Sequence, residues 1–356
     1  MDVSSFNLTG KKILVTGHTG FKGSWLTLFL KLLGAKVYGI SLPIPDSRLL
    51  YKDAKIDQNL DDEYFIDIRD GKKLTSALIQ ISPDYTFHLA AQSLVIDSYI
   101  NPVETFDVNI MGTINILDQI LKLETSKGIC IATTDKVYKN KNAGLPFVEN
   151  DELGNLDPYS ASKAAVEIVV ASMVSVLNKR SIPVSTVRAG NVIGGGDWAM
   201  NRLAPDVVRS LENKTPLLIR YPNATRPWQH VLDCIWGYIL VAEMHLSKTF
   251  KDEMSSFNFG PIKSLSVLHL IEVFEDTWGR KIEISRTEEK LPEKVNLQLD
   301  SSKALNELGW RLMLDPELAI KTTAQSYKKI FDGVDSKHIM ELEIKEYIKN
   351  VKKFVN

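Results

Sequence analysis

The stretch KKILVTGHTGFKG, residues 11–23, joins a short apolar run to a turn with three glycines. The run has the length of a buried strand, and WLTLFLKLLG (25–34) continues with apolar residues at helical spacing. Gly17, Gly20 and Gly23 let the chain turn tightly and let backbone N–H groups approach a pyrophosphate. A tight turn also uses glycine for steric reasons alone, so the interpretation depends on the rest of the chain.

Apolar runs and helical patterns alternate after this stretch, which is typical of a doubly wound sheet. The predicted strands are 11–17, 36–42, 63–68, 84–91, 128–133 and 183–190, and the predicted helices include 70–81, 102–123 and 157–179. We therefore predict an α/β protein with a Rossmann-like, doubly wound parallel sheet and helices on both of its faces.

The alternation loosens after Gly190. Short strands at 217–219 and 256–260 mix with helices around 201–213, 231–246, 264–278 and 316–331, and a terminal helix follows. This pattern predicts a smaller mixed α/β region that caps the carboxyl edge of the sheet. We expect residues 1–190 to bind a cofactor and residues 191–356 to bind mainly the substrate. Segments of the second range can still belong structurally to the first region.

Composition narrows the function classes. The 43 basic and 44 acidic residues among 356 leave no field that favours nucleic acid or a membrane surface. Cys130 and Cys234 lie in apolar surroundings, as reduced thiols of a cytoplasmic protein do. The amino terminus lacks the apolar core of a signal peptide, and no uninterrupted apolar run approaches a membrane helix. We expect a compact cytoplasmic protein without a metal site.

The stretch TTDKVY (133–138) follows the apolar run GICIA almost without transition. In open parallel sheets, ligands bind outside the carboxyl ends of the strands. Two hydroxyls, a carboxylate and an ammonium at such a place predict a chemical site, with Thr134, Asp135 and Lys136 as its candidates.

The stretch YSASK places Tyr159 and Lys163 on one face of a helix, four residues apart. A lysine ammonium, together with a positive nicotinamide ring, would lower the tyrosine pKa. Tyr159 could then act as a general base for a substrate hydroxyl while a hydride leaves the same carbon. The same spacing occurs on solvated helices, so the functional interpretation of this pair depends on the glycine turn and the polar cluster.

Four elements together resemble the extended short-chain dehydrogenase/reductase family: TGHTGFKG, HLAAQ (88–92), the polar cluster and DPYSASKAA. They span the first two-thirds of the chain in the family's order. TTDKVY is similar to the signature of nucleotide-sugar 4,6-dehydratases, except that Lys136 replaces the usual glutamate. With GHTGFKGSWL, AAQSLV and GGGDW, the chain most resembles the dehydratases that act on CDP-glucose, where lysine takes that place.

The resemblance implies an internal redox cycle in which NAD is held tightly and ends as it began. Tyr159 would take the O4 proton, Thr134 would hydrogen-bond the O4 region, and Lys163 would orient the nicotinamide ribose. Asp135, if protonated, would donate to the departing C6 hydroxyl. Lys136 would be the C5 base if burial and nearby cations make it neutral, which we favour; a charged Lys136 would instead stabilise the enolate oxygen.

The resemblance also assigns binding residues. For NAD they are Gly17, Thr19, Gly20, Phe21, Gly23, Asp67, Ile68, Ala90, Ala91, Tyr159 and Lys163, and for the substrate Gln92, Asn191, Asp197, Arg202 and Arg226. Asp67 and Ile68 stand at the end of the third predicted strand, where we expect them to contact the adenine ring. Arginine suits a diphosphate because its fork can donate twice, although a solvated surface arginine is the ordinary alternative. The end of the second strand holds Ser41, with Arg48 farther on, so NAD rather than NADP rests on the resemblance.

Three other functions remain open: a nucleotide-sugar 4-epimerase, a 4,6-dehydratase for another nucleotide sugar, and a non-catalytic nucleotide sensor. The epimerase would need no acid and base for elimination, which disfavours it. The helices 102–123 and 157–179 carry more apolar positions than one sheet face needs. We therefore expect a homodimer in which two helices from each subunit form a bundle, as in the family.

Overall fold

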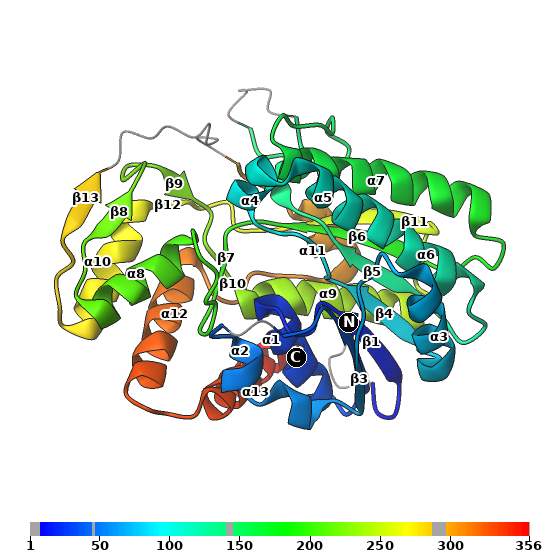
Figure 1. The fold of residues 1–356 in the computed structure, drawn as a ribbon, viewed down its shortest axis with the longest axis horizontal. Coiled ribbons are helices and arrows are strands. Elements are labelled where there is room, and N and C mark those ends of the chain that lie inside the picture. The colour runs from blue at the N-terminus through cyan, green and yellow to red at the C-terminus, as the bar shows by residue number, and fades with distance from the viewer. Residues whose placement is uncertain (1–7, 45–46, 140–144, 287–296, 356) are drawn as a thin grey trace.

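A seven-stranded parallel sheet forms the centre of the computed structural model, which describes residues 8–44, 47–139, 145–286 and 297–355 (Figure 1). The strands are β1 (Lys12–Thr16), β2 (Lys36–Ser41), β3 (Asp62–Phe65), β4 (Tyr85–His88), β5 (Ile129–Ala132), β6 (Val184–Ala189) and β11 (Met254–Phe259). Their order is β11-β6-β5-β4-β1-β2-β3, and every pair is parallel. The order reverses between β1 and β4, where ligands bind in such sheets. The predicted fold class is confirmed.

Helices cover both faces of this sheet because its strands are apolar on both sides (Figure 1). In β1, Ile13 and Val15 face one hydrophobic cluster and Leu14 faces the other, as strand alternation requires. The first cluster contains α1 (Phe21–Leu32), α9 (Val231–Leu246), α11 (Ser302–Leu308) and α13 (Ser336–Val355). The second contains α3 (Gly71–Ile81), α6 (Gly112–Lys122) and α7 (Pro158–Leu177).

Two predicted elements differ from the sequence-based expectation. The helix predicted over 102–123 consists of α5 (Pro102–Phe106), a π-helical turn η2 (Asp107–Met111) and α6. The strand expected at 256–260 in the C-terminal region is β11, which pairs with β6 over its full length and forms the edge of the main sheet. Short helices also occur where none was predicted: α2 (Leu50–Asp53), η1 (Ile56–Asn59) and α4 (Val95–Ile100).

A smaller lobe follows directly from the carboxyl end of β6 and lies beside the sheet in Figure 1. Its helices are α8 (Leu203–Asn213), α10 (Val267–Trp278) and α12 (Pro316–Phe331). Its short strands are β7 (Val192–Ile193), β8 (Leu217–Ile219), β9 (Thr225–Arg226), β10 (Gln229–His230), β12 (Leu265–Ser266) and β13 (Ile284–Arg286). Its core is a separate cluster around Phe274 and Tyr327.

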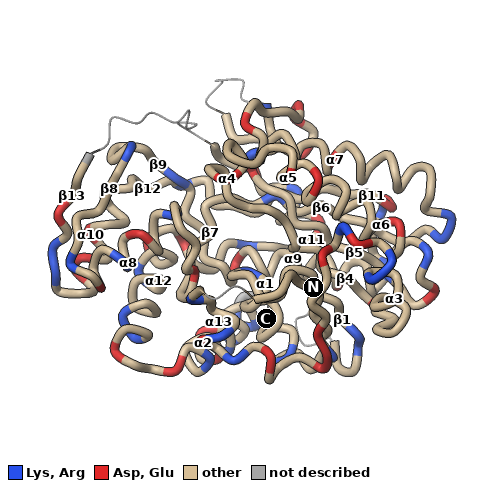
Figure 2. The backbone as a smooth tube through the Cα atoms, viewed as in Figure 1, with Lys and Arg blue, Asp and Glu red and all other residues tan. Residues whose placement is uncertain are grey.

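In the described part of the chain, α7 is the one helix whose length and composition would suit a membrane span. It carries buried Lys163 and Glu167, and its apolar residues pack on β5 and β6, so it is a core helix of the sheet. Acidic and basic residues are interspersed along the described part of the backbone (Figure 2). Residues 1–7, on which the signal-peptide expectation partly rests, lie outside the described residues.

Candidate active site

The turn between β1 and α1 is built as the glycines predicted. Gly17 has a φ of +74° and its N–H donates to the carbonyl of Ile40 at 2.7 Å. A Cβ on Gly17 would lie 2.8 Å from the backbone nitrogen of Ala90, and one on Gly23 would lie 2.1 Å from the Gly17 carbonyl oxygen. In the described structure, no side chain caps the amino end of α1 at Gly20. The backbone N–H groups in the first turn of α1 therefore suit a pyrophosphate.

Side chains around this turn link it to β2 and to the smaller lobe. Thr19 Oγ1 lies 2.6 Å from Ser41 Oγ, which ties the turn to the end of β2. Phe21, the first residue of α1, lies beside Gly194 in the GGGDW loop. Arg48 stacks on Trp198 at 3.4 Å from the ring centroid and faces Asp53 and Glu212. Its guanidinium is therefore already paired with two carboxylates.

The residues expected near the adenine have structural partners. Asp67 accepts from Arg69 Nη2 at 2.6 Å, and this hydrogen bond holds the pKa of Asp67 below its usual value. Ile68 is buried and packs on Gly112, where a Cβ would lie 2.3 Å from Ile68 Cδ1. Their contact with an adenine stays a prediction.

The turn η3 (Asp135–Val137) follows β5 and holds the predicted acid and base together. Asp135 Oδ1 accepts from Thr134 Oγ1 at 2.9 Å and from Lys136 Nζ at 3.3 Å. Asp135 Oδ2 is buried and has no hydrogen-bond partner among the described residues. It lies where a Cβ on Gly190 would be, 1.9 Å away, so this glycine leaves room for the carboxylate.

The electrostatics of Lys136 differ from the neutral amine that we favoured from the sequence. Burial lowers the pKa of Lys136, but the charge of Asp135, the Tyr159 phenol and the hydrogen bond to Asp135 outweigh burial. The pKa of Lys136 is therefore raised, and the arrangement favours an ammonium paired with a carboxylate. The argument from the sequence took Asp135 to be protonated. A protonated Asp135 has no negative charge that could raise the pKa of Lys136.

Tyr159 and Lys163 lie one turn apart on α7, and both are buried. Burial raises the pKa of Tyr159, while Lys136, a hydrogen bond with Thr134 and Arg202 oppose this rise. The lowered tyrosine pKa that we expected requires Lys163 together with a positive nicotinamide ring, and it stays a prediction. Lys163 Nζ donates to the carbonyl of Ala132 at 3.0 Å, and burial together with Lys22 lowers the pKa of Lys163 to about 8.

Two of the predicted substrate residues form an ion pair with each other. Arg202 Nη1 donates to Asp197 Oδ2 at 2.8 Å, and Arg202 Nη2 donates to Ser93 Oγ at 3.3 Å. Arg202 counteracts the raised pKa of Tyr159, and Arg226 contributes a positive charge at Lys136. The structure thus brings both arginines toward the catalytic cluster.

The remaining predicted substrate residues have different surroundings. Asn191 has a φ of +51°, a left-handed conformation that asparagine tolerates. Gln92 donates from Nε2 to Thr105 Oγ1 at 2.9 Å and accepts from the Leu94 N–H at 2.5 Å. These contacts build the loop after β4, and substrate binding by Gln92 stays a prediction.

Comparison with known proteins places this chain in a family. The family model described as GDP-mannose 4,6 dehydratase matches residues 14–323. The chain belongs to this family. A CDP-glucose 4,6-dehydratase of Salmonella typhimurium is 36% identical over 348 residues, which cover 95% of this chain and 96% of the relative. A UDP-glucose 4-epimerase of Cyamopsis tetragonoloba is 27% identical over 330 residues, covering 87% and 92%.

Solved structures share the fold. A UDP-glucose 4-epimerase from Stenotrophomonas maltophila with bound NAD has a TM-score of 0.80 at 21% identity, covering 91% of this chain and 99% of that chain. A dTDP-glucose 4,6-dehydratase from Bacillus anthracis in complex with NAD has a TM-score of 0.74 at 21% identity, covering 90% and 97%. The resemblance stated from the sequence motifs is confirmed, and the protein is an enzyme of the 4,6-dehydratase family.

Several residues beside the site of this family member were not singled out from the sequence. Glu167 lies one turn after Lys163 on α7, and Arg188 pairs with it from β6. A charged residue repeating the Tyr159–Lys163 spacing was the available signal for Glu167. Arg188 stands inside an otherwise buried strand, where an unpaired charge would be costly, so its presence implied a partner.

Proposed function

We propose that the protein is a CDP-glucose 4,6-dehydratase, a hydro-lyase that converts CDP-glucose into CDP-4-keto-6-deoxyglucose and water with NAD⁺ as cofactor. The observation that carries this proposal is the contact between Asp135 and Lys136 beside Tyr159, at the carboxyl end of β5. A 4-epimerase needs a base for O4 but no second pair for the elimination at C5 and C6. The CDP-glucose 4,6-dehydratase relative supports the choice of substrate.

The residues present fit NAD. The amino end of α1 and the cradle around Gly17, Gly20 and Gly23 would hold the pyrophosphate, and Lys163 would orient the nicotinamide ribose. Ser41 and Thr19 offer hydroxyls at the end of β2, while Arg48 is occupied by two carboxylates and the Trp198 ring. This supports NAD over NADP, since a 2′-phosphate would need a cation there. When bound there, NAD⁺ would supply the reversible hydride acceptor that the transfer from sugar C4 to C6 needs.

Tyr159 and Thr134 act at the first carbon. Tyr159 takes the proton from the C4 hydroxyl, and Thr134, which hydrogen-bonds with Tyr159, holds the O4 region in place. Burial alone would keep this phenol protonated, so the nearby cations must stabilise the phenolate during the transfer. Lys136 and Arg202 already oppose the effect of burial.

Asp135 and Lys136 act at C5 and C6. One proton transferred from Lys136 Nζ to Asp135 Oδ1, across 3.3 Å, converts the ion pair into a neutral amine and a carboxylic acid. The amine can then take the proton from C5, and the acid can protonate the C6 hydroxyl, which leaves as water. The pair holds the same number of protons after this exchange as before. Lys136 then returns a proton to C5, and the proton that Tyr159 took from O4 passes to Lys136, which restores the starting charges.

The substrate diphosphate requires donors in the smaller lobe. We assign Arg226, Arg202 and Asn191 to the phosphates, with Asp197 orienting Arg202. Residues 1–190 thus bind NAD, and residues 191–356 bind mainly the nucleotide sugar. The chain crosses between the two parts, since β11, α9 and α13 belong to the sheet and its helical layers.

The assembly and cellular role follow from the same proposal. Exposed apolar residues on α4, α5 and α7 would be covered in a homodimer: Ile100, Val103, Ile168 and Val176. Light scattering at micromolar concentration should therefore give the mass of a dimer.

Cys130 and Cys234 are free and buried, which supports a cytoplasmic protein. We place the product in deoxysugar synthesis for lipopolysaccharide.

Incubation with CDP-glucose and NAD⁺ tests the proposal. A 4-keto sugar absorbing in alkali is expected, together with loss of one water in the mass spectrum. A mixture of glucose and galactose products would support an epimerase, and an inert enzyme would support a nucleotide sensor. The same assay with GDP-, UDP- and dTDP-linked glucose measures base preference.

A further inference from the structure

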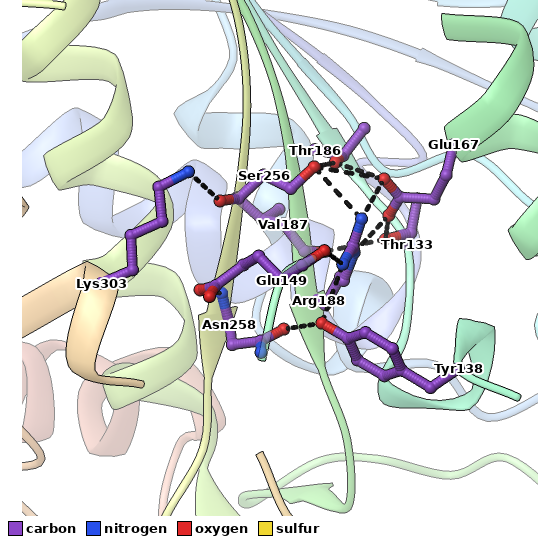
Figure 3. A network of polar contacts seen from close by, with 10 residues as sticks. All are labelled: Thr133, Tyr138, Glu149, Glu167, Thr186, Val187, Arg188, Ser256, Asn258 and Lys303. Carbon is purple, nitrogen blue, oxygen red and sulfur yellow. Dashed lines mark hydrogen bonds and ion pairs between the residues drawn. The ribbon is translucent and has the colours of Figure 1, made fainter. Parts of the chain in front are cut away.

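A buried ion pair lies behind the catalytic turn and connects three elements of the sheet layer (Figure 3). Arg188 on β6 donates from Nε to Glu167 Oε1 and from Nη2 to Glu167 Oε2, both at 2.9 Å. The two side chains are only 3% and 2% exposed. A two-point contact of this kind fixes both the distance and the orientation of the charged groups.

The carboxylate of Glu167 also holds the start of the catalytic turn. Thr133 Oγ1 donates to Glu167 Oε1 at 2.5 Å, and Thr186 Oγ1 donates to Glu167 Oε2 at 2.6 Å. Thr133 directly precedes Thr134 and Asp135, while Glu167 lies one helical turn after Lys163. One carboxylate therefore ties the helix of the Tyr159–Lys163 pair to the turn of the Asp135–Lys136 pair.

The guanidinium of Arg188 holds the other end of the turn. Arg188 Nη1 donates to the Tyr138 hydroxyl at 2.8 Å, and this hydroxyl donates to Asn258 Oδ1 at 2.6 Å (Figure 3). The Tyr138 ring stacks on Phe147 with centroids 4.8 Å apart. Tyr138 directly follows η3, so the turn is held at both ends by partners of one ion pair.

Stability alone does not account for this arrangement. Well-packed apolar side chains often replace a buried ion pair without loss of stability, because burial of the charges costs as much as their attraction returns. The contacts of this pair instead meet on the two segments that carry the proposed acid, base and proton acceptor. Their common effect is a fixed separation between the two segments.

We infer that Glu167, Arg188 and Tyr138 are positioning residues that hold Asp135 and Lys136 in register with Tyr159 and Lys163. The inference rests on the proposed function, because it assigns the proton acceptor for C4 oxidation, Tyr159, to α7 and the elimination pair, Asp135 and Lys136, to the turn after β5. Loosening the turn slows elimination, while oxidation at C4 continues. The enzyme then accumulates reduced cofactor instead of product.

Tyr138→Phe removes the hydroxyl that joins Arg188 to Asn258 and keeps the ring on Phe147. Thr133→Val removes the bond to Glu167 at nearly constant volume, and Thr133→Ser retains the hydroxyl. Tyr85→Phe is the matched control: it removes a buried hydroxyl 2.9 Å from His245 Nδ1, on β4 of the same sheet. Each variant is characterised by its melting temperature, kcat and KM for CDP-glucose, reduced-cofactor absorbance and exchange of the C5 hydrogen.

We expect Tyr138→Phe and Thr133→Val to lower kcat roughly 10- to 100-fold, the loss that a small misplacement of reacting groups produces. KM should stay near the wild-type value, reduced cofactor should accumulate, and Thr133→Ser should recover most of the activity. Tyr85→Phe should lose stability but keep its kcat.

Equal kcat in Tyr138→Phe and Tyr85→Phe, at comparable melting temperatures, would overturn the inference. Equal slowing of C4 oxidation and elimination would overturn it as well, because the network would then not position the Asp135–Lys136 turn in particular. An active wild type with such variants leaves the proposed function standing. A wild type that forms no 4-keto sugar contradicts both.

Discussion

Replacing Gly190 with alanine should displace the carboxyl group of Asp135, the proposed acid, although no titratable residue is itself replaced. The added Cβ would lie 1.9 Å from Asp135 Oδ2 and 2.1 Å from its Cγ, whereas ordinary contacts begin near 3.4 Å. The φ of Gly190 is not in the positive range, so alanine suits the backbone there. Asp135 Oδ1 is held by Thr134 and Lys136, so the carboxylate cannot move without losing these contacts.

The clash sets the size of the expected effect. The carboxylate has to retreat by about 1.5 Å to reach ordinary contact with the new methyl group. A misplacement of about 1 Å can cost roughly 100-fold in rate, which corresponds to about 3 kcal/mol of activation free energy. Elimination should therefore slow by roughly 100-fold or more, while Tyr159 still supports oxidation at C4.

Stopped-flow absorbance of the reduced cofactor and alkaline detection of the 4-keto product distinguish the two steps. Gly190→Ala should accumulate reduced cofactor and form product slowly. Gly71→Ala is the control, because a Cβ on this first residue of α3 meets no atom within 4 Å. Wild-type product formation by Gly190→Ala, with the melting temperature unchanged, would refute the placement of Asp135 against Gly190.

Four further predictions concern single side chains. Tyr159→Phe should nearly abolish conversion and leave CDP-glucose binding, measured by calorimetry, close to normal, whereas wild-type turnover would exclude it as the base. Asp135→Asn should permit C4 oxidation but slow elimination, seen as accumulated reduced cofactor, because an amide supplies no proton; an unchanged rate of product formation would exclude Asp135 as the acid. Lys136→Ala should still reduce the cofactor but lose exchange of the C5 hydrogen with deuterated solvent. Exchange at the wild-type rate would show that Lys136 is not the C5 base. Burial raises the pKa of Glu343 to about 7 from an ordinary 4.5, so wild-type stability should fall as pH rises through that window, by up to about 3 kcal/mol. Glu343→Gln should therefore melt near the wild type at pH 5 and above it at pH 8, and equal melting temperatures at pH 8 would contradict the raised pKa.

The sequence predicted the architecture because the relevant signals are local. The glycines at 17, 20 and 23 and the apolar runs before and after them mark the first strand and helix without reference to distant residues. The main exception is β11, the seventh strand of the sheet, which is separated in sequence from β6 by segments of the smaller lobe and by α9. Nothing in the local pattern of 254–259 says whether the strand pairs with β6 or with another strand of that lobe.

The candidate site was predicted as residue types rather than as charge states. Tyr159, Lys163, Asp135 and Lys136 were found because of their spacing and their places at the ends of strands and helices. Their protonation depends on partners that spacing does not show. The Lys136 ammonium contacts Asp135, which raises the pKa of Lys136, while burial and nearby Lys22 lower the pKa of Lys163 to about 8.

The balanced charge of the whole chain conceals a cationic site. A formal net charge of −1 gave no sign of an anionic ligand, yet Lys136, Arg202 and Arg226 converge on the catalytic turn, and Lys22 lies near Lys163. In the proposed function, both ligands carry a diphosphate, so each would offset part of this excess. Acidic and basic positions are interspersed along the described backbone (Figure 2), and this pattern is uninformative about such a site. What identifies the site is the convergence of these cations from separate segments of the chain, a property of the fold that composition cannot express.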